Sequence, residues 1–498
     1  MASFEHQVSI CSDIWSTQSQ QHFYMGITLH FIDNAMFLHK YVIGFRHFNQ
    51  RHNALGIASM IKTVLQEYNL QHRIFSYSFD NASANTAAVN HLVEDAGQYI
   101  KTPYTHQRCA CHILNLCVQD GLKVLGNMLT PIKLVIDHIW HDSDLRRKWR
   151  NLCLSKNVHP IAFSKDVGTR WNSTYKLLCE AVRYKVLLQE FASIHVPWSI
   201  LDDENVWETC AHICNVLKTF NDATNTMSCV YTPTSHRFLE IAVNVSEAFV
   251  KCFNIPCLTE CMLDMKDKWL KYYQDIPMIY LVTAVFDPRL KLDGLSDLLT
   301  IYYDCLCVNL TQENINVPNI VQQVNTEIGK LLRTFESSAS SSSTAPTPSP
   351  SSTSSSTSLS LAQQVFARRT KTPRHSSSNA EYQDYLNTCF NFDDNVEFDI
   401  LDWWKRLAPK YPTLVKIVQQ IMAVPASTVA VEQAFSRGGN ILGHRRTQLK
   451  PEKLEMQVCI QDWIRAAKRK QRNAPVYDSK SDSNSEDAGT TSESDIEW

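Results

Sequence analysis

The chain has 498 residues, of which 44% are hydrophobic and 20% charged, a composition typical of globular proteins with about two to four domains at this length. The formal net charge of −2 excludes nucleic-acid binding driven by overall charge, so any DNA contact must use local basic patches. The longest apolar run, residues 278–286, is too short for a membrane span, which needs about 18 residues.

The first 80 residues read as three strands, a helix and a fourth strand. Residues 8–14, 23–31 and 37–45 are apolar or alternate in polarity, as strands do. Asn53 is placed to cap a helix, and residues 73–79 form a further alternating strand. This β-β-β-α-β order opens a ribonuclease H-like sheet, so the predicted fold class is α/β.

Asp13 and Asp80 each stand at the C-terminal end of a predicted strand. In this strand order the first and fourth strands lie side by side, so the two carboxylates could share a divalent cation in the crevice at the strand ends. Two-metal phosphoryl-transfer sites need several carboxylates, because Mg²⁺ prefers oxygen ligands. The alternative is that each aspartate is a turn or cap residue.

Two later motifs combine polar and aromatic chemistry. Cys109 and His112 have CxxH spacing, but a zinc site needs about four ligands, so a helix start with a buried thiol is the alternative. Arg170 and Trp171 could pair with a phosphate and stack on an unpaired base, whereas the alternative is a helix N-terminus with a core tryptophan. Residues 145–150 form a basic cluster that either touches DNA or is a solvated helix face.

The second half of the chain divides by composition. Residues 177–336 read as helices, and residues 337–360 are dominated by serine with threonine and proline, which predicts a disordered linker. A basic run at 368–374 follows. A second basic run, at 468–472, is suited to nuclear import or to phosphate contact, or it is a solvated helix end. The acidic tail that follows it is predicted to be disordered.

The stretch from residue 398 to residue 467 is predicted to be a set of packed helices. Pro425 ends one helix, Ser427 or Thr428 caps the next, and Gly438-Gly439 ends it, which places Glu432 mid-helix among small apolar residues. The last helix, from Pro451, is apolar around most of its circumference, so it is expected to be buried in a core or between subunits.

Several segments of this stretch together resemble the C-terminal dimerisation region of the hAT transposase family. They are Leu401-Asp-Trp-Trp-Lys405, Tyr411-Pro-Thr-Leu414, Val429-Ala-Val-Glu-Gln-Ala-Phe-Ser436, Gly438-Gly-Asn-Ile-Leu442, Arg445-Arg446, Leu449-Lys-Pro-Glu452 and Gln461-Asp-Trp463. Within the family, these motifs are most similar to those of the ricesleeper and daysleeper BED zinc-finger proteins of plants. The resemblance implies a ribonuclease H-like α/β fold interrupted by a large all-helical insertion, with a C-terminal helical dimerisation region.

The resemblance also assigns candidate site residues. The segments around Asp13 and Asp80, residues 12–16 and 79–85, resemble the family's first two catalytic acid motifs, and Glu432 matches the third. The three acids are thereby expected to bind Mg²⁺ or Mn²⁺ if the chain is catalytically active. Cys109 and His112 are implied to support the site. Arg170 and Trp171 resemble a pair placed near the DNA end, and residues 286–291 resemble a further family motif.

The predicted organisation therefore has five parts. They are the first part of the ribonuclease H-like core (1–125), the helical insertion (126–336), the linker (337–380), the dimerisation region with the last ribonuclease H-like helix (381–467), and the basic run with the acidic tail (468–498). Family members begin with a BED zinc finger that reads DNA, and this chain is expected to lack one.

Two functions stay open, with a third behind them. The first is a nuclear, transposase-derived, DNA-binding protein that forms a homodimer or higher oligomer through residues 398–467, with no membrane contact. The second is an active hAT transposase core that cleaves and transfers DNA strands with a divalent metal. The third is a decayed fragment that keeps only self-association.

Overall fold

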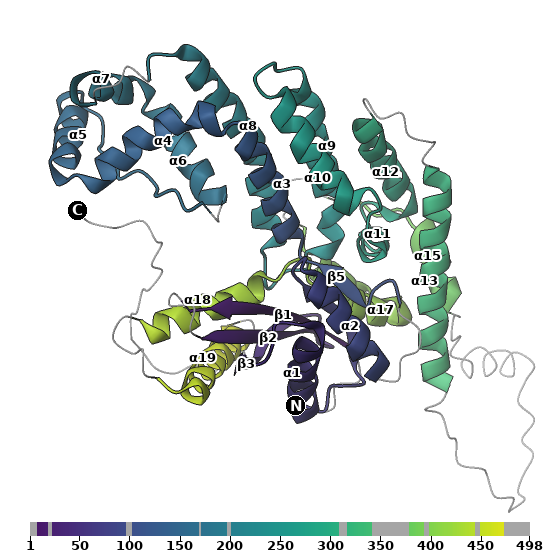
Figure 1. The fold of residues 1–498 in the computed structure, drawn as a ribbon. Helices are drawn as coiled ribbons and strands as arrows, with labels where there is room; N and C mark the ends of the chain where they lie inside the picture. Colours follow the sequence, from purple (N-terminus) through teal and green to yellow (C-terminus); the bar gives the residue numbers. More distant parts are fainter. Residues whose placement is uncertain are drawn as a thin grey trace, which may run out of the picture.

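The computed structural model describes residues 7–17, 22–95, 102–168, 171–196, 201–307, 316–340, 378–392, 398–443 and 449–472. Figure 1 shows a sheet flanked by helices, with an array of helices standing over it. Within those ranges, no helix combines the length and the apolar character needed to cross a bilayer.

The sheet has five strands in the order β3-β2-β1-β4-β5. The strands are β1 (Val8–Ser16), β2 (Phe23–Ile32), β3 (Leu38–His47), β4 (Ile74–Phe79) and β5 (His106–Arg108). The first three strands are antiparallel neighbours, whereas β1 pairs with β4, and β4 with β5, in parallel. This confirms the predicted opening of the fold, although β1 runs three residues beyond Asp13 and does not end there.

Each face of the sheet is covered by a pair of helices that come from distant parts of the sequence. On one face, α1 (Ala54–Glu67) and α2 (Ser83–Asp95) pack on strand residues such as Ile10 and Ile27. On the other face, α18 (Val429–Leu442) and α19 (Pro451–Arg472) pack on Cys11 and its neighbours. Because successive strand residues point to opposite faces, Ile10 and Cys11 serve different cores.

The helical array begins directly after β5. Its elements are α3 (Ala110–Val124), α4 (Gly126–His141), α5 (Ser143–Ser155), α6 (Trp171–Arg183), α7 (Lys185–His195), α8 (Glu204–Met227), η1 (Ser235–Arg237), α9 (Phe238–Phe253), α10 (Thr259–Tyr273), α11 (Met278–Val285), α12 (Lys291–Cys307) and α13 (Val317–Ser340). In Figure 1, α4 to α7 form a lobe at the far end of α8, and α13 stands on the opposite side.

The chain returns from the array to the sheet through α15 (Ser378–Asn387), α16 (Ile400–Leu407) and α17 (Pro412–Ile421). The expected linker at 337–380 is helical at both ends, since α13 reaches Ser340 and α15 begins at Ser378. Glu336 accepts the backbone N–H of Ser378 at 2.8 Å, so the two ends lie side by side. Residues 341–377, including the basic run at 368–374, lie outside the described residues, as does the tail from 473.

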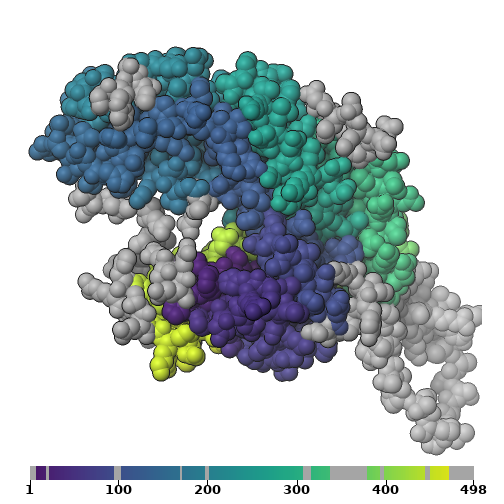
Figure 2. Space-filling model, in the orientation of Figure 1, coloured from purple at the N-terminus to yellow at the C-terminus, as the bar shows by residue number. Residues whose placement is uncertain are grey.

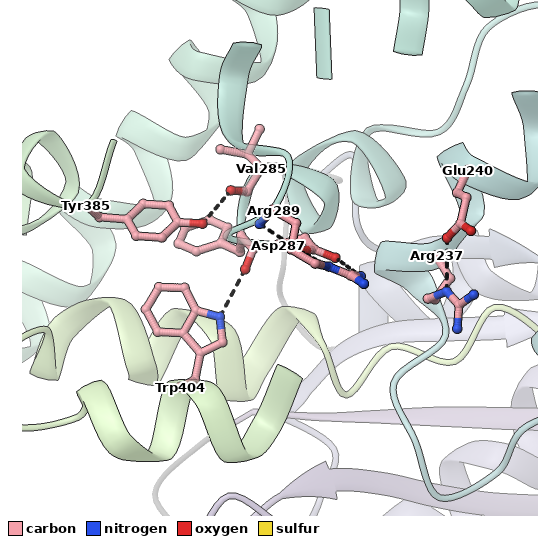
Figure 3. A network of polar contacts seen from close by, with 8 residues as sticks. Arg237, Glu240, Val285, Asp287, Arg289, Tyr385 and Trp404 are labelled. Atoms are coloured by element: carbon pink, nitrogen blue, oxygen red, sulfur yellow. Dashed lines mark hydrogen bonds and ion pairs between the residues drawn. The ribbon is translucent and has the colours of Figure 1, made fainter. Parts of the chain in front are cut away.

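The segment between α11 and α12 joins the helical array to the C-terminal helices (Figure 3). Trp404 donates its indole N–H to the carbonyl of Phe286 at 3.0 Å, and the Tyr385 hydroxyl donates to the carbonyl of Val285 at 2.8 Å. Asp287 is buried and forms two hydrogen bonds with the guanidinium of Arg289. The motif at 286–291 is therefore a structural junction.

A single large apolar core runs from α3 to the loop after α17. It is separate from the two cores that cover the sheet faces. The apolar face predicted for α17, with Leu414, Ile417, Val418 and Ile421, is buried in it. The helical array and helices α15 to α17 thus share one core, whereas α18 and α19 pack on the sheet.

Candidate active site

Asp13 and Asp80 lie on neighbouring parallel strands at the same end of the sheet. The β1–β4 register pairs Cys11 with Ser78, so the positions two residues further along are Asp13 and Asp80. Asp80 follows directly after β4, whereas Asp13 is still inside β1 and pairs with Gly26 of β2. Both aspartates are partly exposed, so they are accessible at this edge.

Local hydrogen bonds hold both carboxylates in place. Asp13 accepts the N–H of Ile14 at 2.7 Å. Asp80 accepts the N–H of Ala82 at 3.0 Å and the amide of Asn85, whose side chain is buried. Asp80 is therefore a turn residue before α2, which is the alternative given above for this aspartate. It also lies at the end of β4, beside the C-terminal part of β1. Asn85 was not predicted to act here, because an amide five residues further along gives no distinct sequence signal.

Glu432 reaches the same end of the sheet from 352 positions further along the chain than Asp80. The loop before α18 is bonded across the strand ends by three contacts. Ser78 donates its hydroxyl to the carbonyl of Pro425 at 3.1 Å, the thiol of Cys11 donates to the carbonyl of Ser427 at 3.7 Å, and the N–H of Ala110 donates to the carbonyl of Ala426 at 2.8 Å. These bonds tie the start of α18 to β1, β4 and α3.

The helix of Glu432 differs from the sequence expectation in two respects. Glu432 lies in the first turn of α18 and not at its middle, and the helix passes through Gly438-Gly439 to end at Leu442. The glycines do not terminate it, and at Gly438 the lack of a side chain serves packing against the sheet. A Cβ on Gly438 would lie 2.6 Å from Phe45 Cζ on the sheet. Gly443, with φ of +40°, is the residue that ends the helix.

The charges of the three acids act on one another. The pKa of Asp13 is raised to about 7, mainly by burial and then by the charge of Asp80, with a smaller effect of Glu432, whereas the N–H of Ile14 lowers it. Among the described residues, however, no three His, Cys, Asp or Glu side chains stand close enough to hold a metal ion as they are. The structure therefore brings the acids within electrostatic reach without forming a closed set of ligands.

Cys109 joins the elements around the acids. Its backbone N–H donates to the carbonyl of Phe79 at 2.7 Å, and its sulfur accepts the N–H of Thr428 at 3.3 Å. Burial raises the pKa of its thiol to about 11. A protonated, fully buried thiol is not a free metal ligand, so its contribution is to fix the first turn of α18 to α3. His112 is partly exposed three residues further along α3.

The structure describes only one member of the predicted Arg170-Trp171 pair. Arg170 falls outside the described residues. Trp171 is the first residue of α6 and is only 4% exposed, because it packs in the large helical core. This agrees with the alternative given above, a core tryptophan at a helix N-terminus. Nearby, Gln119 donates to the carbonyl of Gly168 at 3.1 Å. Gln119 is ten positions from Cys109 along α3, on the order of 15 Å at the helical rise.

A hollow separates the helical lobe from the sheet body in Figure 2, where the lobe overhangs the purple and yellow surface. On the sheet side of the array, exposed Arg108 ends β5, and its guanidinium lies 5.8 Å from the ring of Tyr272 on α10. Lys271 lies 5.9 Å from the same ring. A basic and aromatic cluster, Arg108, Lys271 and Tyr272, therefore stands next to Cys109 and the strand ends. This cluster could not be predicted from sequence patterns, since Arg108 and Lys271 are 163 positions apart.

Several described residues of two other predicted basic clusters make contacts within the protein. In α5, Trp149 is fully buried while Arg147 and Lys148 pair with Asp144, so this helix shows a solvated face over a core tryptophan. In the run at 468–472, which continues α19, the Arg469 guanidinium lies 3.4 Å from the centre of the Tyr231 ring.

Comparison with known proteins bears on the family resemblance of the chain. Three family models match: the ZBED1 RNase-like domain over residues 11–119, the ZBED1 RNase-like helical domain over 107–216, and the hAT family C-terminal dimerisation region over 381–464. They confirm the resemblance inferred from the sequence.

Relatives match along most of the chain. A putative AC transposase of Zea mays is 27% identical over 93% of this chain and 58% of its own length. The zinc finger BED domain-containing proteins RICESLEEPER 1 of Oryza sativa subsp. japonica and DAYSLEEPER of Arabidopsis thaliana are 24% and 22% identical, over 92% and 89% of this chain. The chain spans 58% to 65% of the length of these three relatives.

Proposed function

We propose that this chain, which carries the RNase-like, helical and dimerisation regions found in hAT transposases, is a transposase-derived protein that binds DNA and self-associates in the nucleus. The observation that carries the proposal is the junction of the RNase-like sheet with α18 and α19, which lie within or beside the dimerisation region at 381–464. Nuclear location and DNA binding are inferred from the relatives.

The surface proposed to bind DNA is the hollow beneath the helical lobe (Figure 2). The Arg108, Lys271 and Tyr272 cluster stands at the end of β5, where Arg108 pairs with Phe79, the residue before Asp80, and it supplies two cations beside an aromatic ring. A guanidinium pairs with a phosphate by two hydrogen bonds, and a ring stacks on an unpaired base. Local positive charge of this kind can act although the whole chain is slightly negative.

A second function, divalent-metal-dependent strand cleavage and transfer, is favoured by the acids. Asp13, Asp80 and Glu432 form a donor set of carboxylate oxygens, which suits Mg²⁺ or Mn²⁺. Such a cation activates the attacking oxygen and neutralises charge at the phosphate. Among the residues that the structure describes, no three such groups are close enough as they stand, so cation binding would require these carboxylates to move closer together.

The chain's own residues have defined roles in this second function. Asp13, whose pKa is about 7, must release the proton that it holds part of the time near neutral pH. Asn85 and the N–H of Ala82 orient Asp80 through one of its oxygens. Cys109 keeps the first turn of α18, and with it Glu432, against the strand ends.

One experiment separates the two functions. The chain and its Glu432→Gln variant are incubated with a supercoiled or hairpin-forming DNA and Mn²⁺, and nicks are counted. Metal-dependent nicking that disappears in the variant would establish the second function. DNA retention without nicking in both proteins supports the first, and absence of DNA retention at low salt would contradict it.

A further inference from the structure

Helix α19 has two faces with different environments. Leu454, Val458 and Cys459 are buried against the sheet. The opposite face exposes four large apolar residues, which are 41% to 50% accessible: Met456, Ile460, Trp463 and Ile464. The sequence predicted that the helix would be buried around most of its circumference. In a single copy of the chain these four residues remain exposed, so the prediction is not met on this face.

The buried face is fixed to the edge of the sheet by specific bonds. β3 is an edge strand, and its backbone groups are partly satisfied by α19 side chains. Asp462 accepts the N–H of Val42 at 2.8 Å. Trp463, which lies at the border between the two faces, donates its indole N–H to the carbonyl of Val42, also at 2.8 Å, while its side chain stays 41% exposed. Glu455 accepts the N–H of Phe45 at 3.3 Å. Because these bonds join α19 to β3, α19 cannot turn its outer face toward the sheet without breaking them.

The exposed residues follow the spacing of a helix-pairing seam. Met456, Ile460, Trp463 and exposed Ala467 are separated by four, three and four positions, which is the repeat of a and d positions in coiled coils. Ile464 flanks the seam. A seam of this repeat is matched by another helix with the same repeat, and a second copy of α19 provides one in an isologous contact.

We propose that this outer face of α19, defined by Met456, Ile460, Trp463 and Ile464, docks on the same face of a second copy of the chain. The four residues fall inside the match to the hAT dimerisation region, which ends at residue 464. The proposal rests on the self-association stated under the proposed function and locates it on one helix. Such an interface would leave the strand ends and the hollow open, because the inner face of α19 already lies between the seam and the sheet.

The test is sedimentation of the full chain over a range of concentrations. Ile460→Glu places a charge in the seam, so we expect dimer dissociation to become at least about tenfold easier. Val186→Glu is the matched control, since Val186 on α7 is 73% exposed and distant in sequence from the dimerisation region. Circular dichroism of both variants checks that the fold is kept.

The outcomes are distinct. An Ile460→Glu chain that dimerises as tightly as wild type would overturn the α19 interface while leaving self-association standing. A wild-type chain that stays monomeric at all concentrations would overturn both. If Ile460→Glu fails to fold, the pair Met456→Ser and Ile464→Ser makes the same test, because small polar residues are tolerated on an exposed helix face. A tight dimer in that folded pair would also overturn the interface.

Discussion

Asp462 holds α19 on the sheet from a fully buried position. Its Oδ1 lies 2.6 Å from Nζ of Lys40 and 2.6 Å from Nη1 of Arg437, and the side chains of Asp462 and Lys40 are 2% and 0% exposed. Burial alone would raise the pKa of Asp462, but Lys40 and Arg437 outweigh it and hold this pKa below its usual value. The stabilisation is therefore complete above about pH 3.9 and is lost only as the pH falls through the lower folded pKa.

Asp462→Asn should strongly destabilise the protein. The change leaves Lys40 buried without its charge partner, and breaking a buried ion pair by removing one member costs about 3–5 kcal/mol. Urea unfolding at pH 7 measures the difference. Asp222→Asn breaks the exposed Lys218–Asp222 pair and serves as the control, with a change within about 0.5 kcal/mol. Equal effects of the two variants would contradict the role given to Asp462.

His30 predicts a different pH dependence. Its pKa is lowered to about 3, mainly by burial and then by the charge of Lys40, whereas Asp462 opposes the shift. Its Nε2 lies 3.0 Å from Oγ1 of Thr28. Because the unfolded pKa is about 6.5, the stabilisation is full above that pH and is lost progressively as the pH falls toward the folded pKa.

Between pH 7.5 and 5.5, wild type should therefore lose about 1.4 kcal/mol more than His30→Gln. Urea midpoints at the two pH values give the comparison. His72→Gln, at an exposed histidine, should follow wild type. If the loss is the same in His30→Gln as in wild type, His30 is not the group that titrates.

At this scale the sequence identified some residues and missed others for a physical reason. Asp13 and Asp80 could be found from strand alternation, since each lies at or near the end of a strand. Glu432 could be found only by resemblance, because nothing local marks one helical glutamate among many. The contacts between Cys109 and Thr428, and between Lys40 and Asp462, join positions 319 and 422 residues apart, and single-chain patterns carry no information on such pairs.

Among the elements, α18 shows how close packing is achieved between a helix and the sheet. Gly438 lies where a Cβ would meet the Phe45 ring at 2.6 Å, and Gly26 on β2 lies where a Cβ would meet Val431 Cγ1 at 2.6 Å. Glycine inside a helix costs about 1 kcal/mol relative to alanine, so the sequence pattern favoured a helix end here. The pattern was wrong because close approach to the sheet outweighs that cost.

Gly438→Ala should therefore destabilise the protein by about 1–3 kcal/mol, as overpacking does, although alanine is the better helix former. Gly439→Ala is the control one position away, where a Cβ would lie 3.6 Å from Trp15 in ordinary contact. That variant should be neutral or more stable by up to about 1 kcal/mol. Urea unfolding of both variants decides the matter, and a stabilised Gly438→Ala would show that α18 can shift away from the sheet freely.

The path of the chain through the whole molecule explains how acids so far apart in sequence come to the same end of the sheet. The chain leaves the sheet at β5, builds the helical array and returns through α17 to α18. One continuous core from α3 to the loop after α17 makes this excursion a rigid spacer. The order of elements from β1 to α2 was predictable from composition and periodicity, whereas the three-residue strand β5 was not predicted. The helix boundaries at 340 and 378 were not predictable either, because serine-rich sequence continues into helix at both ends.

A test at this scale concerns where DNA lies. If it occupies the hollow beside the Arg108, Lys271 and Tyr272 cluster, Arg108→Ala removes about one phosphate contact. Affinity should fall for all DNA sequences alike, and the slope of log affinity against log salt should decrease by about 0.9 for a duplex. Binding is measured by fluorescence anisotropy between 50 and 200 mM salt, conditions that span about the range where such contacts dominate.

Arg147→Ala provides the contrast, because Arg147 is 72% exposed on α5 in the lobe and pairs with Asp144. It should leave both affinity and salt slope unchanged if DNA lies by the strand ends. A loss at Arg147 with none at Arg108 would instead move the DNA to the outer surface of the lobe. In that arrangement Asp13, Asp80 and Glu432 would be out of reach of a phosphate, and the second proposed function would fail together with the location of the first.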